Sequence, residues 1–220
     1  MNAGINELFD LNETIAADLF WDLNYPWEAL PKIRDYIVRL GKTLDPAVFE
    51  QRSETVWVAK SAKIFDSAWI GEYVIIDEEA QIRHCAFIRE CAIVGKGATV
   101  GNSTELKNVV LFNKVEAPHY NYVGDSILGF HAHMGAGSIT SNVKADRTNV
   151  AVKDGEESVE TGLRKFGAML GDYAEIGCNA VLNPGTVVGA HSNVYPTSCV
   201  RGVVPGNHIW KADGTVVEKK

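Results

Sequence analysis

The stretch "VAKSAKIFDSAWIGEYVIIDEEAQIRHCAFIRECAIVGKGATVGNSTELKNVVLF", residues 58–112, places a large apolar residue at every sixth position. Ten consecutive positions share this phase: Val58, Ile64, Ile70, Ile76, Ile82, Ile88, Val94, Val100, Leu106 and Phe112. A helix would repeat every 3.6 residues and a half-buried strand every two. A step of six, often with alanine four residues later, is typical of the hexapeptide repeat of a β-helix.

The same step returns towards the C-terminus, at Leu128, Met134 and Thr140 and then at Leu170, Ile176, Leu182, Val188, Val194 and Val200. Three hexads close one coil, so residues eighteen apart should stack at the ordinary interstrand spacing of about 4.8 Å. The apolar positions then point inward and form the core. We therefore expect an all-β fold, a parallel β-helix over residues 56–206.

Three segments leave this pattern. Residues 1–55 contain the amphipathic stretches "NETIAADLFWDL" and "KIRDYIVRLG", the second ending at Gly41, and predict a helical cap over the first coil. Residues 143–168 are polar, and "NVAVKDGEESVETG" predicts an extruded hairpin that turns at Asp154-Gly155. The tail, residues 207–220, predicts a second small hairpin at Asp213-Gly214.

Composition excludes several classes of partner. The 21 Lys and Arg against 28 Asp and Glu give a net charge of −7, which disfavours a nucleic acid. No apolar run approaches the length needed to span a membrane, and the acidic start "MNAGINELFDLNE" lacks the basic residues of a secretory signal. The four cysteines form no CxxC pair and indicate reduced, buried thiols. We expect a soluble cytoplasmic protein.

The six-residue step also indicates which polar side chains share a surface. Arg89 and Lys107 are eighteen residues apart, and each follows an inward aliphatic residue, so they should project outward from neighbouring coils. Like charges placed directly opposite in a sheet repel each other. The pair therefore indicates an anion between them, with phosphate as the natural candidate. The alternative is that both side chains extend separately into water.

His119 lies between a proline and two tyrosines, in "EAPHYNY". Histidine can accept a proton at neutral pH, so it is a candidate general base. The alternative is an exposed strand histidine with no task. On one prism His119 would face a different way from Lys107, and the two would converge only in a groove between two prisms. A shared site of this kind predicts an oligomer.

From Arg89 onward the chain resembles the acetyltransferase domain of bifunctional glucosamine-1-phosphate acetyltransferase/uridylyltransferases. It resembles still more the β-helical half of archaeal sugar-1-phosphate nucleotidylyltransferases with the same activity. The matching motifs are "IRECAIVG", "GNSTELKNVVLFNKVEAPHYNYVGDS", "HMGAGSITSN" and "TGLRKFGAMLGDYAEIGCNAVLNPGTVVG". The resemblance implies a left-handed helix, a homotrimer, and an acetyl-CoA-dependent N-acetyltransferase acting on an amino-sugar phosphate such as glucosamine-1-phosphate.

The resemblance also implies roles for single residues. His119 would be the general base that takes a proton from the sugar amine. The residues implied to bind the substrate are Arg89 and Lys107 for the phosphate, Tyr122 and Asn142 for the sugar, and Glu105 for holding the amine or orienting His119. The residues implied to lie near acetyl-CoA are Cys178, Tyr195 and Pro196.

The chain also departs from the family pattern. His133 stands where the family has an asparagine before the "IGAG" turn, and it becomes a candidate sugar contact. After Asn142 the family's "YDG" and following lysine are missing, and Lys165, Lys144 or Arg147 are candidates to replace that lysine at the sugar or the cofactor. Residues 1–55 contain no Gly-rich nucleotide loop, so we expect no nucleotidylyltransferase activity.

Two other functions remain open at this point. One is a γ-class carbonic anhydrase-like zinc enzyme, suggested by His131 and His133 in "HAH". A third histidine with ligand spacing is missing from the sequence, so we expect no metal. The other is a non-catalytic trimeric scaffold or sugar-nucleotide-binding relative, suggested by the altered segment after Asn142.

Overall fold

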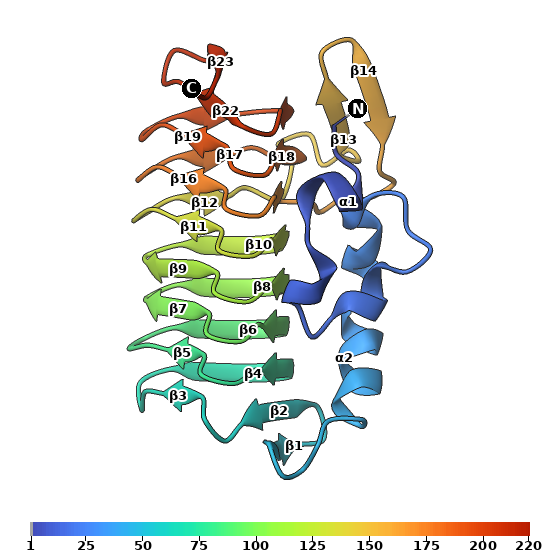
Figure 1. The fold of residues 1–220 in the computed structure, drawn as a ribbon, viewed down its shortest axis with the longest axis vertical. Helices are drawn as coiled ribbons and strands as arrows, with labels where there is room; N and C mark the ends of the chain where they lie inside the picture. Colours follow the sequence, from blue (N-terminus) through green and yellow to red (C-terminus); the bar gives the residue numbers. More distant parts are fainter. Residues whose placement is uncertain (1) are drawn as a thin grey trace.

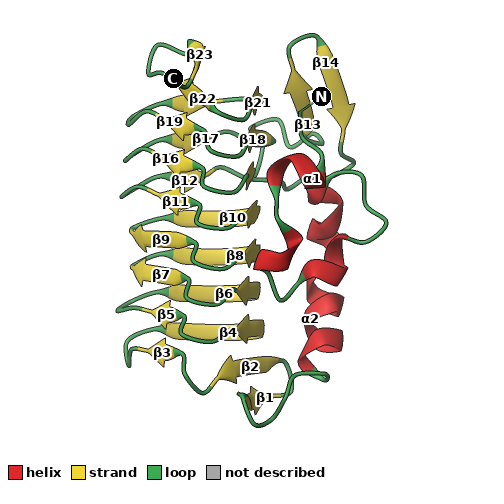
Figure 2. Ribbon diagram, in the orientation of Figure 1, coloured by secondary structure: helices red, strands yellow, loops and turns green. Residues whose placement is uncertain are grey.

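The computed structural model describes residues 2–220 as a three-sided prism of stacked coils (Figure 1). It is a left-handed parallel β-helix. The hexapeptide pattern predicted the parallel β-helix, and the resemblance alone implied its left hand. Ile64 pairs with Ile82 and Ile70 with Ile88, each one coil of eighteen residues apart. Figure 2 shows the strands winding upward and the helices gathered along one side.

Three sheets account for the strands. The twelve-stranded sheet contains β1 (Phe49–Ser53), β2 (Val56–Ala59), β4 (Trp69–Ile76), β6 (Phe87–Val94), β8 (Glu105–Leu111), β10 (Tyr122–Leu128), β12 (Ile139–Thr140), β15 (Ala168–Leu170), β17 (Val181–Leu182), β18 (Thr186–Val188), β20 (Cys199–Val200) and β21 (Val203–Val204). The nine-stranded sheet contains β3 (Lys63–Ile64), β5 (Gln81–Ile82), β7 (Thr99–Asn102), β9 (Glu116–His119), β11 (His133–Met134), β16 (Glu175–Ile176), β19 (Asn193–Val194), β22 (His208–Trp210) and β23 (Val216–Glu218). A two-stranded hairpin contains β13 (Ala151–Asp154) and β14 (Glu157–Glu160).

The prism has three faces. The long strands β4, β6, β8 and β10 contribute to two of them, because β10 pairs with β12 at its start and with β15 at its end. We call the surface formed by the starts of the long strands, with β12, β17 and β20, the open face. Their ends, with β15, β18 and β21, form the covered face. The nine-stranded sheet forms the short-strand face.

Two successive coils are each a residue short, the first from Val94 to Leu111 and the second from Leu111 to Leu128, which corrects the predicted inward column. Ile88 still pairs with Leu106 at eighteen residues, but Val94 pairs with Leu111 at seventeen, and the register shifts at Arg89. Leu111 therefore occupies the place predicted for Phe112. The ring of Phe112 instead packs against Phe9 and Phe20 of the N-terminal segment, with centroids 5.0 and 5.7 Å apart.

The N-terminal segment, residues 2–48, lies along the covered face. Its helices are α1 (Ile5–Leu8), the 3-10 helices η1 (Leu11–Glu13), η2 (Ala17–Phe20) and η3 (Pro26–Lys32), and α2 (Ile33–Gly41). We predicted a cap over the first coil, but α2 packs on β4, β6 and β8, and η3 packs on β10 (Figure 1). None of the described helices is long and apolar enough to cross a membrane.

An apolar column explains this placement. Where the long strands end, each coil presents a fully buried aliphatic residue one position from the inward column: Ile75, Ile93, Val110, Ile127 and Met169. Left bare, this strip would expose apolar surface along much of the prism. The helices bury this strip instead of covering the first coil. The open edge of the first coil is bordered by β1, which runs antiparallel to β2.

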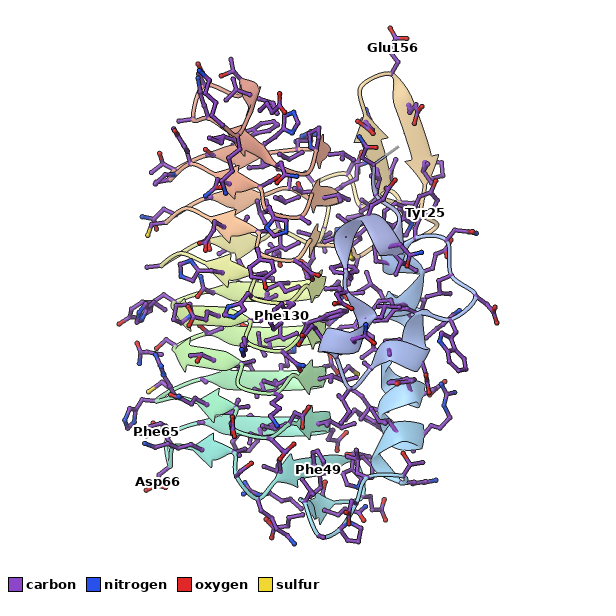
Figure 3. The ribbon with its side chains drawn as sticks, in the orientation of Figure 1. Tyr25, Phe49, Phe65, Asp66, Phe130 and Glu156 are labelled. Atoms are coloured by element: carbon purple, nitrogen blue, oxygen red, sulfur yellow. The ribbon has the colours of Figure 1, made fainter. Side chains whose placement is uncertain are left out.

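The extruded hairpin forms as the sequence predicted. Asp154 pairs with Glu157, so the turn lies next to Gly155, and Glu156 stands at the tip (Figure 3). The backbone N–H of Asn2 donates to Asp154 Oδ2 at 3.1 Å, which brings the N-terminal segment against the hairpin. The tail forms its own hairpin, with β22 antiparallel to β23.

Substitution of Trp27 measures how much the packing of the N-terminal segment on the prism contributes to the free energy of unfolding. Trp27 is 1% exposed, and its ring lies 4.4 Å from Tyr25 and 5.7 Å from Phe166, measured between centroids. Because a large buried ring is lost, Trp27→Ala should reduce the free energy of unfolding by about 3–5 kcal/mol. Urea unfolding followed by circular dichroism measures this change. Trp21→Ala is the control: its side chain is 70% exposed, and its effect should stay within about 0.5 kcal/mol.

Candidate functional site

A polar cluster lies on the open face where the long strands begin. Its members are Arg89 in β6, Glu105 and Lys107 in β8, Tyr122 in β10, and Asn142 just after β12. Tyr122 is in register with Glu105 on one side and Ile139 on the other. The structure thus brings five of the predicted substrate residues onto one face, and we call them the open-face cluster.

The predicted stacking of Arg89 on Lys107 is wrong. The residue opposite Lys107 is Glu90, because the short coil leaves Arg89 at the register shift. The guanidinium of Arg89 lies 3.6 Å from Glu105 and its side chain is 52% exposed, whereas Lys107 Nζ lies 2.9 Å from Asp125 and its side chain is 13% exposed. Each cation therefore has its own carboxylate in place of an anion shared between them.

Asp125 is a member of the site that the sequence analysis missed. It is 3% exposed, and its carboxylate accepts hydrogen bonds from Lys107 Nζ at 2.9 Å, Asn108 Nδ2 at 3.0 Å and Asn142 Nδ2 at 2.6 Å. Asn142 Nδ2 also donates to the Tyr122 hydroxyl at 3.2 Å. The available signal was one charged residue inside the otherwise apolar strand "YVGDSIL".

Tyr122 keeps its proton in this setting. Burial is the largest cause that raises the pKa of its phenol, and the nearby carboxylates of Asp125 and Glu105 raise it further. A neutral phenol can accept one hydrogen bond and donate another. Tyr122 is therefore able to donate a hydrogen bond to a ligand while accepting one from Asn142.

His119 lies at the end of β9, on the corner between the short-strand face and the open face. Its backbone N–H donates to Asn121 Oδ1 at 3.0 Å, and Asn121 is itself 2% exposed. In the coil below, a Cβ on Gly101 would lie 1.6 Å from the Pro118 carbonyl oxygen, so this approach requires glycine. Within residues 2–220 the exposed imidazole of His119 has no hydrogen-bond partner.

The same corner carries the predicted cofactor residues. His119, Ala136, Cys178 and Pro196 follow one another on successive coils. The residue after each of the last three donates its backbone N–H to the coil below: Gly137 to His119 at 3.0 Å, Asn179 to Ala136 at 2.9 Å, and Thr197 to Cys178 at 2.8 Å. His119 and Cys178 are thus two strand spacings, about 10 Å, apart. Only the methyl group of Ala136 lies between them. We call this column the His119 corner, and Tyr195, 44% exposed, lies beside it.

The prediction that the cysteines are buried is wrong for three of them, because only Cys91 is buried and the other three are exposed. Other predicted residues lie elsewhere. His133 is on the short-strand face, with Nδ1 2.9 Å from Glu175. Lys165 is exposed in the chain that returns from the hairpin and does not line the groove described next. Across residues 2–220, no hydrogen bond or ion pair joins His119 to the open-face cluster, and Glu105 contacts Arg89 instead.

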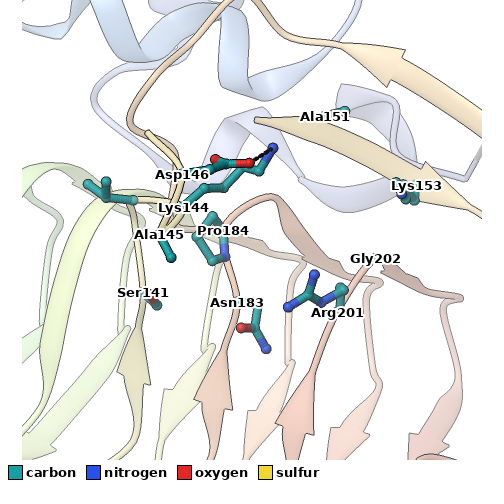
Figure 4. A pocket seen from close by; sticks show the side chains of 11 residues that line it. Ser141, Lys144, Ala145, Asp146, Ala151, Lys153, Asn183, Pro184, Arg201 and Gly202 are labelled. Atoms are coloured by element: carbon teal, nitrogen blue, oxygen red, sulfur yellow. Dashed lines mark ion pairs between the residues drawn. The ribbon is translucent and has the colours of Figure 1, made fainter. Parts of the chain in front are cut away.

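A groove of about 620 Å³ separates the hairpin from the open face (Figure 4). Ser141, Asn183 and Arg201 form its floor, from successive coils, whereas Lys144 and Lys153 come from the hairpin segment. Each floor residue follows an inward residue, as Arg89 follows Ile88. The six-residue step would therefore have identified these three positions, although the sequence analysis did not use it there.

The groove is predominantly cationic. Lys144, Lys153 and Arg201 line it together with one carboxylate, Asp146. The backbone N–H of Thr148 is the largest cause that lowers the pKa of Asp146, and Lys144 Nζ lies 3.7 Å from that carboxylate. In the described chain, neither Lys153 nor Arg201 forms an ion pair. Two uncompensated cations beside a groove suit a phosphate-bearing ligand.

The histidines of "HAH" are engaged in other contacts. The ring of His131 stacks on Tyr173, with centroids 5.5 Å apart and planes 13° from parallel, and His133 contacts Glu175. Among residues 2–220 no three or more His, Cys, Asp or Glu side chains are grouped so that they could hold a metal ion.

Solved structures of acyltransferases show partial similarity. The UDP-N-acetylglucosamine acyltransferase of Francisella novicida matches at 16% identity over 75% of this chain and 68% of that chain, with a TM-score of 0.43. The GDP-perosamine N-acetyltransferase of Caulobacter crescentus matches at 18% identity over 74% and 56%, with a TM-score of 0.34. These values are too low to transfer a residue's role from those chains to this one.

Sequence relatives are more informative, although no family model matches the chain. A bifunctional sugar-1-phosphate nucleotidylyltransferase/acetyltransferase of Sulfurisphaera tokodaii is 32% identical over 109 residues, 50% of this chain and 27% of the relative. The bifunctional protein GlmU of Methanococcus maripaludis is 32% identical over 120 residues, 54% of this chain and 29% of the relative. The matches thus cover less than a third of these relatives' length. Over about half its length, the chain is similar in sequence to bifunctional sugar-1-phosphate nucleotidylyltransferase/acetyltransferases, as its motifs indicated.

Proposed function

We propose that this protein transfers an acetyl group from acetyl-CoA to the amine of an amino-sugar phosphate such as glucosamine-1-phosphate. His119 would take the proton from the amine as it attacks the thioester carbonyl. Backbone N–H groups would stabilise the oxyanion, and the CoA thiolate would then leave. No covalent enzyme intermediate is needed.

The observation that carries this proposal is the His119 corner. An unpartnered, exposed imidazole stands two coils below Cys178, and only a methyl group separates them along the column. A general base must reach its proton directly or through one water, and a side chain already held by protein partners would first have to release them. The thioester would lie along this corner, beside Cys178, Tyr195 and Pro196.

The groove supports the choice of an anionic co-substrate. CoA carries phosphate groups, and Lys153 and Arg201 offer cations that have no protein carboxylate to neutralise them. The groove floor, formed by Ser141, Asn183 and Arg201, lies on the same three coils as Ala136, Cys178 and Pro196, and His119 lies one coil below them. One extended molecule is thus proposed to place its phosphates in the groove and its thioester at the corner.

The open-face cluster supports a sugar phosphate as the acceptor. Arg89 is half exposed, and its 3.6 Å contact with Glu105 is the kind of surface ion pair that contributes little free energy. A phosphate with better geometry would compete well for this guanidinium. Tyr122 and Asn142 would then hydrogen-bond the sugar, as the family resemblance implies.

The proposed site also requires more than one copy of the chain, and we propose a homotrimer. His119 and the open-face cluster do not meet within one described chain, and the covered face is occupied by the N-terminal segment. Large apolar side chains are exposed at Trp69 and Phe87 on the open face and at Tyr120 next to His119. A corner of one copy docking on the open face of the next is a heterologous contact, and such contacts close into a ring of three when successive copies are related by a third of a turn.

The first test replaces the proposed base. His119→Ala should lower kcat by about 10²–10⁴-fold while leaving both KM values nearly unchanged, because only proton removal is lost. Steady-state thiol release from acetyl-CoA with an amino-sugar phosphate measures it. His84→Ala is the matched control, because His84 is an exposed histidine on the same corner of a lower coil. A His119→Ala enzyme with full kcat would show that the base is another group.

The second test concerns the cationic groove. Arg201→Ala should raise the KM for acetyl-CoA about tenfold and leave the acceptor KM unchanged, because a charged hydrogen bond to phosphate is lost. The same kinetic assay, with each substrate varied in turn, separates the two constants. Lys96→Ala serves as control, since Lys96 pairs with Glu78 at 3.3 Å and lines no groove. Equal acetyl-CoA KM values for both variants would argue against phosphate binding here.

The third test concerns assembly. Size-exclusion chromatography with light scattering should give the wild type three times the 24.0 kDa mass of one chain. Trp69→Ser should shift it towards one chain, because Trp69 is 65% exposed on the proposed contact surface. Trp21→Ser, which alters a 70% exposed tryptophan on the N-terminal segment, should leave the trimer intact. A monomeric wild type with full acetyltransferase activity would contradict the shared site.

A further inference from the structure

The buried carboxylate of Asp125 has an arrangement that the proposed chemistry does not yet explain. Asp125 is 3% exposed and accepts three side-chain N–H groups, from Lys107, Asn108 and Asn142. Two of these donors, Lys107 and Asn142, belong to the open-face cluster. Asp125 thus joins Lys107 to Asn142 through hydrogen bonds on the buried side of the cluster. Asn108 Nδ2 also donates to the Leu30 carbonyl of the N-terminal segment at 3.3 Å.

A carboxylate only accepts hydrogen bonds, so it dictates which way its partners point. The NH₂ group of Asn142 must face Asp125, to which Nδ2 donates at 2.6 Å. The same nitrogen donates to the Tyr122 hydroxyl at 3.2 Å. Both amide protons are then used within the cluster. What Asn142 can offer a ligand is its carbonyl oxygen, which is an acceptor.

Tyr122 and Lys107, next to Asn142, offer hydrogen-bond donors to a ligand instead of an acceptor. The Tyr122 oxygen accepts from Asn142, so its own proton is available to donate outward. The Lys107 ammonium has three N–H donors, and the structure shows one of them used, by Asp125. The site therefore presents one acceptor at Asn142 and donors at Tyr122 and Lys107.

We propose that Asp125 is a positioning residue that sets the hydrogen-bonding polarity of the acceptor site. This inference rests on the proposed function. A ligand that fits must place a hydroxyl or amine N–H at Asn142 and acceptor oxygens at Tyr122 and Lys107. An amino sugar carrying a phosphate has both kinds of group within one small molecule.

The alternative is that Asp125 only stabilises the corner between the open and covered faces, where the short coils meet. Both roles predict a loss of stability on substitution, because breaking a buried charge pair leaves Lys107 unpaired. They differ in the acceptor. A polarity-setting residue affects how folded molecules bind the amino sugar, whereas a purely structural one affects only how many molecules fold.

The experiment compares Asp125→Asn with Asp172→Asn. Asp172 is also buried, at 9% exposed, and it accepts the backbone N–H groups of Asp10 and Phe130 at 2.7 Å, away from the cluster. For Asp125→Asn we expect an acceptor KM about tenfold higher, because the Asn142 amide can then rotate. The acetyl-CoA KM should not change. For Asp172→Asn we expect a lower urea midpoint with wild-type KM values.

A second variant covers the case in which Asp125→Asn does not fold. Replacing both members of a buried ion pair by neutral groups is often tolerated. Lys107→Met/Asp125→Asn should therefore fold. Its acceptor KM should be about tenfold above that of Lys107→Met, in which Asn108 and Asn142 still donate to Asp125, because the double variant also removes the anchor of the Asn142 amide. Equal acceptor KM values for these two variants would overturn the inference.

The outcomes also separate this inference from the proposed function. Calorimetric titration of the wild type with glucosamine-1-phosphate and other amino sugars accompanies the kinetics. A wild type that neither binds nor acetylates any of them overturns both. A wild type that acetylates one, with Asp125→Asn and Asp172→Asn alike in acceptor KM, overturns the role of Asp125 and leaves the acetyltransferase intact.

Discussion

The hydrogen bonds between successive coils are the constraint on which the rest of the molecule depends. Because each coil pairs its backbone with the coil above and below, side chains at equal offsets form columns. The length of a coil then decides which side chains meet. One missing residue puts Val94 opposite Leu111 and leaves Arg89 out of register, and Lys107 contacts Asp125 instead of standing above Arg89.

The faces of the prism differ in what they contact because the side chains in their outer columns differ in polarity. The outer column of the covered face is apolar, from Ile75 through Met169. Because exposing apolar side chains to water is unfavourable, the N-terminal segment covers this column. The open face and the corner at His119 carry polar side chains and remain accessible. These surfaces, unlike the covered face, remain available to ligands and to further copies of the chain.

The cations of the open-face cluster differ from those of the neighbouring groove in whether a carboxylate neutralises them. In the cluster each cation has a carboxylate, Arg89 with Glu105 and Lys107 with Asp125, so recognition there would depend on the direction of hydrogen bonds. In the groove Lys153 and Arg201 have none within the described residues, which favours anions through simple attraction. A chain of net charge −7 thus still concentrates positive charge at one place.

The β-helix, its inward column as far as Leu106 and the extruded hairpin could be predicted from the amino-acid sequence, because a six-residue period and an Asp-Gly turn are local signals. The resemblance in its motifs implied His119 as the base and Cys178 near acetyl-CoA, but their stacking through Ala136 spans a shortened coil and the hairpin and is seen only in the structure. Four features are seen only in the folded chain: the two seventeen-residue coils, the position of the N-terminal segment, the groove and the network around Asp125. Each of these depends on pairing between residues distant in the chain, and a repeat of apolar letters records which side chains point inward but not which polar groups meet outside.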